Sequence, residues 1–188
     1  MKIILASNSP RRRELLKGLD INFDIRIIPD IDESYPTDMP PDEIPYYLAQ
    51  KKAAFYRAST QPDELVITAD TIVVLDGDIL EKPVDKNDAI RMLKRLSGRK
   101  HQVITAVALT TIEQQKTFSV ESFVDFATLT DEEINYYVDK YQPYDKAGAY
   151  GIQEWIGYVG VRSIEGSFYN VMGLPIQRLY QELKNFVY

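Results

Sequence analysis

A single acidic residue interrupts the most apolar stretch of this 188-residue chain. The runs Leu65–Ala69 and Ile72–Leu75 both have the composition of buried strands, and Asp70-Thr71 stands between them. Asp76-Gly77 follows the second run, and this dipeptide is the strongest short signal for a β-hairpin. The segment therefore predicts buried strands of a sheet. It also places a carboxylate where burial and a nearby metal can shift its pKa.

Helices and strands alternate along the rest of the chain, and turn-forming residues separate them. The sequence predicts further strands over 2–6, 23–28, 102–109 and 117–127, and helices from Pro10, over 47–58, over 85–96, from Thr130 and from Pro175. Lys146–Gly160 is rich in glycine, and a hairpin is expected across Glu165-Gly166. Because hairpins interrupt the alternation, we expect one α/β domain over residues 1–188, with a mixed sheet.

Composition excludes several classes of site and partner. The chain has no cysteine and one histidine, His101, so thiolate nucleophiles, Cys/His zinc sites and iron–sulfur clusters are ruled out. Any metal must bind to carboxylates. The net charge of −6 argues against binding to nucleic acid or to an anionic membrane. No apolar run approaches the ~20 residues of a membrane span, and a cytoplasmic location is expected.

The first polar cluster opens the first helix. Ser7-Asn8-Ser9-Pro10 is followed by three arginines, 11–13, in a chain that is acidic overall. Free backbone N–H groups at a helix start bind anions, and guanidinium groups grip phosphate oxygens in a bidentate way. The alternative is that Ser9 only caps the helix and that the arginines form a solvated face. We favour a phosphate site here.

Charged side chains elsewhere fit the same ligand. Asp70 could hold Mg²⁺ or accept a proton from water, and Asp32-Glu33 could share that cation; a turn-forming aspartate and a solvated acidic loop are the alternatives. Lys82, fixed before Pro83, could bind a phosphoryl group, although strand-end lysines are commonly just solvated. Lys51-Lys52 are weaker candidates for positive charges that bind the same ligand.

The last cluster is Asp145–Gln153. Its small residues let a ligand approach the backbone, and the Gln153 amide offers a donor and an acceptor to the edge of a base. A loop stiffened by Tyr150 is the alternative. No GxGxxG, Walker A or GxSxG motif occurs in the chain, and a histidine at the start of a strand, such as His101, is more often structural.

Taken together, these segments resemble the Maf family of septum-formation-inhibitor-like nucleoside triphosphate pyrophosphatases, over nearly the whole chain. The residues that carry the resemblance are Ser7-Asn8-Ser9-Pro10-Arg11-Arg12-x-Glu14-Leu15-Leu16, Ala69-Asp70-Thr71, Lys82-Pro83, Leu96-Ser97-Gly98-x-x-His101, Thr105-Ala106-Val107, Asp145–Gln153 and Gly173-Leu174-Pro175. One departure is Glu154-Trp155, where many relatives have glycine after the glutamine.

The resemblance implies an inosine-triphosphatase-like α/β fold, with a central mixed sheet flanked by helices and two lobes around a cleft. It also implies hydrolysis of dTTP and UTP to the monophosphate and pyrophosphate with a divalent cation, Mg²⁺ or Mn²⁺. By position, the resemblance implies that Asp70 accepts the proton and that Glu33 and Asp70 bind the metal. It implies that substrate specificity depends on Arg12, Thr71 and Gln153. The implied phosphate-binding residues are Ser7, Arg12, Lys52 and Lys82.

Two other functions remain open at this stage. One is a non-catalytic nucleotide-binding regulator of septum formation, and the other is a pyrophosphatase for purine or modified-base triphosphates on the same fold. The sequence does not rank dTTP against UTP, choose the metal, decide between a monomer and a homodimer, or distinguish cleansing of the nucleotide pool from arrest of cell division.

Overall fold

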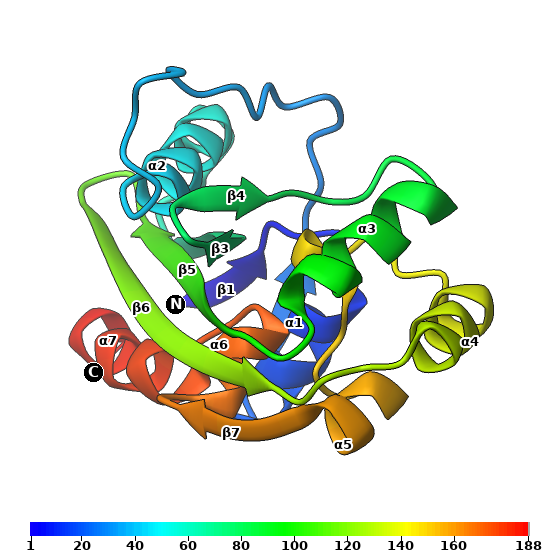
Figure 1. Ribbon diagram of the computed structural model, residues 1–188. Coiled ribbons are helices and arrows are strands. Elements are labelled where there is room, and N and C mark those ends of the chain that lie inside the picture. Colours follow the sequence, from blue (N-terminus) through cyan, green and yellow to red (C-terminus); the bar gives the residue numbers. More distant parts are fainter. Residues whose placement is uncertain (188) are drawn as a thin grey trace. The chain divides into compact units, whose positions relative to one another are not determined.

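The computed structural model describes residues 1–187 (Figure 1). The helices are α1 (Pro10–Lys17), α2 (Ile44–Arg57), α3 (Lys86–Leu96), α4 (Asp131–Tyr141), the 3₁₀ helix η1 (Ala147–Ala149), α5 (Trp155–Gly160), α6 (Phe168–Met172) and α7 (Ile176–Val187). The strands are β1 (Lys2–Leu5), β2 (Phe23–Ile25), β3 (Glu64–Leu75), β4 (Asp78–Leu80), β5 (Lys100–Thr110), β6 (Gln115–Phe126) and β7 (Val161–Glu165). Among residues 1–187, no helix has the length and apolar character needed to span a bilayer.

The chain divides into two compact units. The first unit comprises Met1–Asp70, Thr105–Val120 and the segment from Gly173 onward, and the second comprises Thr71–Ile104 and Glu121–Met172. Three long strands, β3, β5 and β6, contribute residues to both units. The unit boundary in β3 falls directly after Asp70.

The strands form a mixed sheet, as the sequence predicts. Their hydrogen-bonded order is β2-β1-β3-β5-β6-β7, with β4 paired to β3 beside this path. In the first unit β1 runs parallel to both β2 and β3, and Leu5 is the partner of Ile67. In the second unit β4 pairs antiparallel with β3, and β7 pairs antiparallel with β6. Parallel and antiparallel pairs therefore coexist, which fits an alternation of helices and strands interrupted by hairpins.

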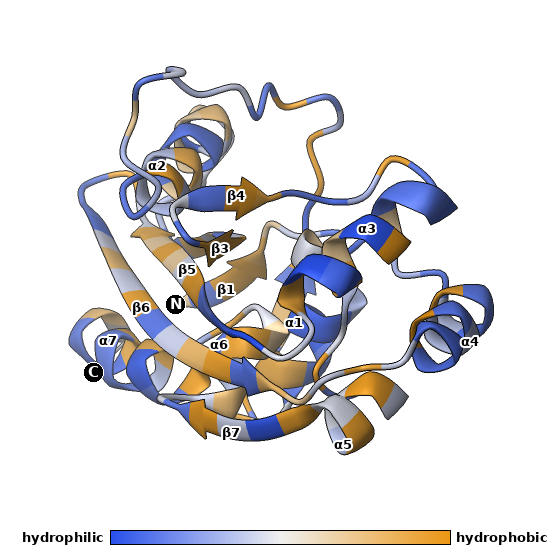
Figure 2. Cartoon of the chain, in the orientation of Figure 1, coloured by the Kyte–Doolittle hydropathy of each residue, from blue (hydrophilic) through white to orange (hydrophobic). Residues whose placement is uncertain are grey.

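Each unit has its own buried apolar residues. In the first unit Ile4 and Val66 pack with Tyr56, and a second cluster consists of alanines from α2 and β5. In the second unit one large core joins the end of β3 to helices α3 and α4. Figure 2 shows the matching pattern, with hydrophobic residues concentrated in β1, β3 and β5 and hydrophilic ones on the outer turns of α3 and α4. Burial of these apolar side chains is the main stabilising contribution to such a fold.

Local signals correctly place several element boundaries. The Ser9 hydroxyl caps α1, and the Asp85 carboxylate caps α3 by accepting from the backbone N–H of Asp88 at 2.8 Å. The capping box predicted at the start of α4 is present, with Thr130 and Glu133 each bonding to the other's backbone N–H. These caps satisfy N–H groups that have no partner inside the helix.

Two expectations about strands are wrong. Asp70-Thr71 does not separate two strands, and the alternative of a turn-forming aspartate is also wrong, because Glu64–Leu75 is one continuous strand. The predicted hairpin across Glu165-Gly166 is absent: β7 pairs with β6, and the chain after Gly166 forms α6. Gly166 has a φ of 109°, so it does make a turn, but the turn leads into a helix.

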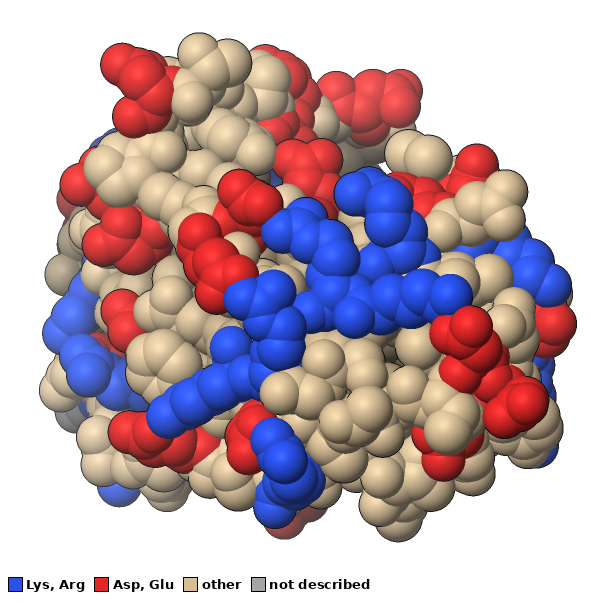
Figure 3. All heavy atoms as spheres, viewed as in Figure 1, with Lys and Arg blue, Asp and Glu red and all other residues tan. Residues whose placement is uncertain are grey.

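Lysine and arginine gather on the face shown in Figure 3, over α3 of the second unit. Arg91 pairs with Asp88 of the same helix. Lys94 lies 2.9 Å from a carboxylate oxygen of Asp131, and Arg95 lies 2.6 Å from one of Asp78. Exposed pairs of this kind contribute little to stability, about 1 kcal/mol at most. Their main effect is to balance the local charge of this helix.

The only histidine is structural. His101 is 2% exposed, and its Nε2 atom lies 2.7 Å from the Tyr150 hydroxyl. The imidazole ring also packs edge-on against Phe126, with ring centroids 5.1 Å apart. Burial lowers the pKa of His101 from 6.5 to about 4. The side chain is therefore neutral in the folded protein at neutral pH and does not serve as an acid or base at the predicted site.

The shifted pKa of His101 predicts loss of stability in mild acid. As the pH falls below 6.5 the unfolded chain binds a proton that the folded protein binds only near pH 4. The free energy of unfolding should therefore fall between these two values, by about 3 kcal/mol in total. Urea unfolding at pH 7 and pH 4.5, compared between the native chain and His101→Gln, measures this contribution. Equal losses in the two proteins would contradict it.

Candidate active site

The site in the first unit begins at the turn between β1 and α1. Because β1 and β3 are parallel and Leu5 is the partner of Ile67, the residues that follow these two positions lie at the same end of the strand pair. Ser7 is buried in this turn, and its hydroxyl accepts from the backbone N–H of Ser9 at 3.2 Å. The turn thus places a buried serine before the first N–H groups of a helix, at the end of the strand pair where Asp70 follows β3 residue Ile67.

Arg12 ties three segments of the first unit together. Its Nε atom donates to the carbonyl oxygen of Gly173 at 2.8 Å, and its Nη1 atom donates to that of Ala69 at 2.9 Å. Burial lowers the pKa of the Arg12 guanidinium, and the negative charge of Asp70 opposes that shift. Arg12 is thus a positive charge held in a fixed position next to the predicted catalytic carboxylate, and it also has a structural role that the sequence did not indicate.

Lys52 lies between the two carboxylates predicted to bind metal. Its Nζ atom is 2.6 Å from Oδ1 of Asp70 and 3.0 Å from Oε1 of Glu33. The side chains of Lys52 and Asp70 are only 13% and 11% exposed, whereas that of Glu33 is 51% exposed. The structure therefore brings together four of the predicted residues, Arg12, Glu33, Lys52 and Asp70, in one cluster of the first unit.

A second lysine of α2 holds the loop that carries Glu33. The Nζ atom of Lys51 lies 2.7 Å from both Oδ2 of Asp32 and the carbonyl oxygen of Ser34. The same hydrogen bond from Lys51 is the main reason that the pKa of Asp32 is lowered to about 2. Lys51 thus anchors the loop on both sides of Glu33, and the adjacent Lys52 contacts Glu33 itself. The sequence indicated these two lysines only as weak candidates for a positively charged site.

The carboxylate ligands at this site fit a divalent cation that is also coordinated by oxygen atoms of its substrate. Carboxylate oxygens, as on Glu33 and Asp70, are the ligands that Mg²⁺ and Mn²⁺ prefer. Within residues 1–187 no three carboxylate, histidine or cysteine side chains converge on one point. Two protein carboxylates are too few for a complete cage, but Mg²⁺ is commonly held by one or two carboxylates together with water and phosphate oxygens.

The remaining predicted residues lie in the second unit. Thr71 is half-buried at the start of that unit's part of β3, and Lys82 is exposed on the segment after β4. The carbonyl oxygen of Glu81 accepts from the backbone N–H of Gly148 at 3.2 Å, which ties the Lys82 segment to η1. Gly148 has a φ of 69°, and a Cβ atom there would lie 3.1 Å from Val73, so this turn requires glycine.

Gln153 has an acceptor atom available inside the second unit. Its side chain is half-buried, and its Oε1 atom is buried without a hydrogen-bond partner among residues 1–187. Buried polar atoms normally have a partner, and an exception calls for an explanation such as a missing ligand. The position agrees with the predicted use of this amide for recognition of a base.

A buried network that sequence reasoning missed supports the Gln153 loop. Lys146 is 8% exposed, and its Nζ atom lies 3.3 Å from Oε1 of Glu154. The other carboxylate oxygen of Glu154 accepts from the Tyr137 hydroxyl, which itself accepts from the backbone N–H of Gly151 at 2.9 Å. Burial, followed by the bond to Glu154, raises the pKa of Tyr137 well above its usual value. Lys146 and Tyr137 therefore hold the side chain of Glu154, the residue at which this chain differs from many relatives. Tyr137 comes from α4, which is distant in the sequence.

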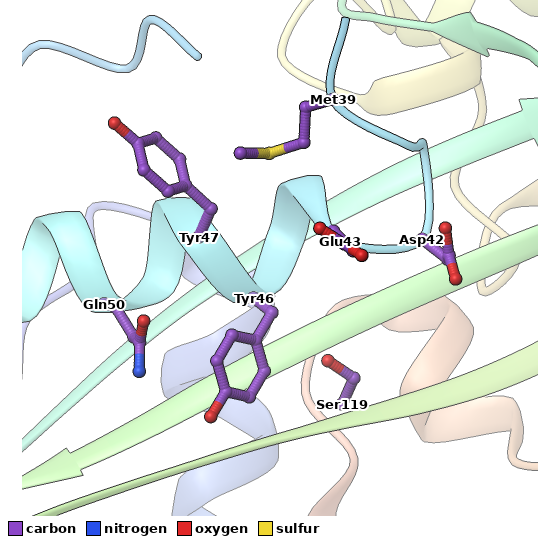
Figure 4. Close-up of a pocket in the computed structure, with 7 residues that line it drawn as sticks. All are labelled: Met39, Asp42, Glu43, Tyr46, Tyr47, Gln50 and Ser119. Carbon is purple, nitrogen blue, oxygen red and sulfur yellow. The ribbon is translucent and has the colours of Figure 1, made fainter. Parts of the chain in front are cut away.

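A hollow of about 430 Å³ lies elsewhere in the first unit, near the start of α2. Figure 4 shows Met39 and Tyr47 on one side of the helix and Tyr46 on the other, facing Ser119. None of the residues that line it belongs to the predicted site. The hollow is therefore distinct from the cluster around Asp70.

Comparison with known proteins identifies relatives over the full length of the chain. A family model described as Maf-like protein matches residues 2–186. Proteins named dTTP/UTP pyrophosphatase are 62% identical in Bacteroides thetaiotaomicron, over 97% of this chain and 95% of the relative, and 62% identical in Parabacteroides distasonis, over 98% and 96%. A protein of the same name from Flavobacterium psychrophilum is 45% identical over 100% of this chain and 95% of its own length.

Solved structures show the same fold at much lower identity. The Staphylococcus aureus Ham1 protein aligns with a TM-score of 0.54 at 18% identity, covering 97% of this chain and 100% of that protein. A HAM1 protein from Coxiella burnetii aligns with a TM-score of 0.52 at 15% identity, covering 98% and 99%. The predicted α/β fold class is thereby confirmed.

Proposed function

The chain belongs to the Maf family, and from this premise we propose that it is an enzyme that hydrolyses dTTP and UTP to the nucleoside monophosphate and pyrophosphate. The observation that carries the proposal is the cluster in which Lys52 bridges Asp70 and Glu33 beside the half-buried side chain of Arg12. A triphosphate needs both positive charge for its oxygens and a carboxylate for the attacking water, and this cluster offers both.

Asp70 is the proposed proton acceptor. Water attacks the α-phosphorus, a new P–O bond forms, the bond from the α-phosphorus to the oxygen bridging to the β-phosphorus breaks, and pyrophosphate leaves. The proton lost by the water is accepted by the Asp70 carboxylate, whose Oδ1 atom lies 2.6 Å from Lys52 in the free protein. A positioned carboxylate that accepts a proton in this way typically contributes about 10²- to 10⁴-fold to the rate.

Positive groups stabilise the charge that develops on the departing pyrophosphate. We assign Ser7, Arg12, Lys52 and Lys82 to the phosphate oxygens. Arg12 needs little reorganisation for this role, because two backbone carbonyls already hold its guanidinium. Mg²⁺ or Mn²⁺ bound to Glu33 and Asp70 would supply further charge neutralisation at the phosphoryl oxygens.

Gln153 is the proposed contact to the base, and Arg12 and Thr71 remain proposed specificity positions. The buried Oε1 atom of Gln153 can accept from the N3–H group of uracil or thymine, and the amide NH₂ group can donate to a neighbouring carbonyl. Cytosine and adenine do not present a ring N–H group next to a carbonyl oxygen. Guanine does, at N1–H and O6, so its rejection would rest on the larger size of a purine. We therefore expect selection for the imide edge shared by the two pyrimidines.

A panel of triphosphates tests this function. The purified chain should release pyrophosphate from dTTP and UTP with Mn²⁺, and kcat/KM for ATP and GTP should be at least about 100-fold lower. Chromatography of the products distinguishes pyrophosphate from stepwise loss of phosphate. Tight binding of dTTP without any product would instead support a regulator, and faster hydrolysis of ITP would support a purine enzyme.

The same panel on Gln153→Ala locates the origin of the preference. Loss of the amide should lower kcat/KM for dTTP and UTP by about 10- to 100-fold, because the imide N–H loses its partner in a buried site. Gln181→Ala, an exposed substitution on α7, is the matched control and should leave all rates unchanged. An unchanged preference in Gln153→Ala would remove this residue from base recognition.

A further inference from the structure

Lys52 occupies the place between the two carboxylates to which the metal is assigned. Its ammonium group is within hydrogen-bond distance of both Asp70, at 2.6 Å, and Glu33, at 3.0 Å. An ammonium group and a divalent cation would compete for the same two oxygens and would repel each other at this separation. Binding of the metal to both carboxylates therefore requires Lys52 to move away.

The chain provides few other ligands for a metal. Within the described part of the chain, 1–187, no third carboxylate, histidine or cysteine side chain joins Glu33 and Asp70 in a metal-binding group. A cation that arrives alone must displace Lys52 and gains only two protein side chains. A cation that arrives on a triphosphate brings phosphate oxygens as ligands, and these same oxygens are acceptors for the displaced ammonium group.

We propose that Lys52 is a resident counter-cation that makes the metal bind together with the nucleotide and not before it. In the free protein Lys52 neutralises Glu33 and Asp70, and on loading it exchanges these carboxylates for the triphosphate. This inference rests on the proposed function and specifies the order of loading at that site. Metal and nucleotide should therefore raise each other's affinity by the same factor, because the coupling between two ligands is reciprocal.

The exchange does not require the Glu33 loop to unfold. Lys51 holds Asp32 and Ser34 on either side of Glu33, independently of Lys52. Its ring contact with Tyr47, 5.9 Å from Nζ to the ring centroid, adds a further connection to α2. Lys51 must therefore stay in place during the test, and Lys17→Met, which removes one positive charge from an exposed residue of α1, is the control.

The test measures binding of Mn²⁺ by electron paramagnetic resonance, with and without a dUTP analogue whose α,β-bridging oxygen is replaced by an imido group. In the native chain the analogue should tighten Mn²⁺ binding by at least about fivefold. Lys52→Met should bind Mn²⁺ alone at least about fivefold more tightly than the native chain and should lose most of the coupling. Lys17→Met should show no such gain, and Lys52→Arg should behave like the native chain.

The outcomes separate this inference from the proposed function. If Lys52→Met and Lys52→Gln, shown by circular dichroism to be folded, bind Mn²⁺ alone no more tightly than the native chain, the counter-cation role is wrong. Equal affinity of the native chain for Mn²⁺ with and without bound analogue would also overturn it. Failure of the chain to hydrolyse dTTP would refute the function instead, and the comparison of Mn²⁺ alone in the native and Lys52 variants would still decide the role of Lys52.

Discussion

Asp70→Asn is expected to lower kcat for dTTP by about 1,000-fold while the protein stays folded. The substitution keeps the size and shape of the side chain, and the amide oxygen can still accept from Lys52 at the position of Oδ1. The NH₂ group that replaces Oδ2 cannot accept a proton from water, and an amide is a weaker metal ligand than a carboxylate. Turnover at saturating substrate and Mn²⁺ measures the effect.

Asp63→Asn is the matched control for this prediction. Asp63 is exposed and lies directly before β3, so its substitution changes the net charge by the same amount away from the cluster. It should retain full activity. An Asp70→Asn protein that melts like the native chain and keeps more than about a tenth of its kcat would exclude Asp70 as proton acceptor.

Local patterns predict much of this fold. The capping residues Ser9, Asp85 and Thr130 bond to backbone groups only three residues away, so a short stretch of sequence contains both partners. The hairpin at Asp76-Gly77 is predictable for the same reason, since φ is positive at both positions. The prediction of a hairpin at Glu165-Gly166 is wrong because β7 pairs with β6, which is distant in the sequence, and not with the segment that follows Gly166. A turn signal marks a change of direction but does not identify the element that follows.

The candidate site was predictable as a set of chemical groups, but its contacts were not. Residues such as Asp70 and Lys52 stand out by their type and by their place at the ends of apolar runs, and the family resemblance adds their roles. The bonds of Arg12 to the carbonyls of Ala69 and Gly173 join residues far apart in the chain, and backbone carbonyls carry no sequence signal. The burial of Lys146 against Glu154 was hidden for a similar reason, because charged residues in a glycine-rich loop are usually solvated.

The backbone around Gln153 depends on a glycine that no motif marked. Gly157 lies in α5, and its backbone N–H donates to the carbonyl oxygen of Glu154 at 2.9 Å. A Cβ atom at this position would lie 1.7 Å from the carbonyl oxygen of Ile152, a backbone atom with no rotamer that could relieve the clash. The side chain of Ile152 is 4% exposed and belongs to the core of the second unit, so the carbonyl cannot move without disturbing that core.

Gly157→Ala should therefore lower the free energy of unfolding by about 3 kcal/mol or more and should raise KM for dTTP, because the displaced carbonyl directly precedes Gln153. Urea unfolding and substrate kinetics measure the two effects. Gly18→Ala is the matched control: a Cβ atom there lies 3.3 Å from the Leu15 carbonyl oxygen, and the residue has helical backbone angles. The control should change stability by about 1 kcal/mol at most. If both variants unfold at the same urea concentration as the native chain, the packing of Ile152 over Gly157 does not hold the Gln153 loop.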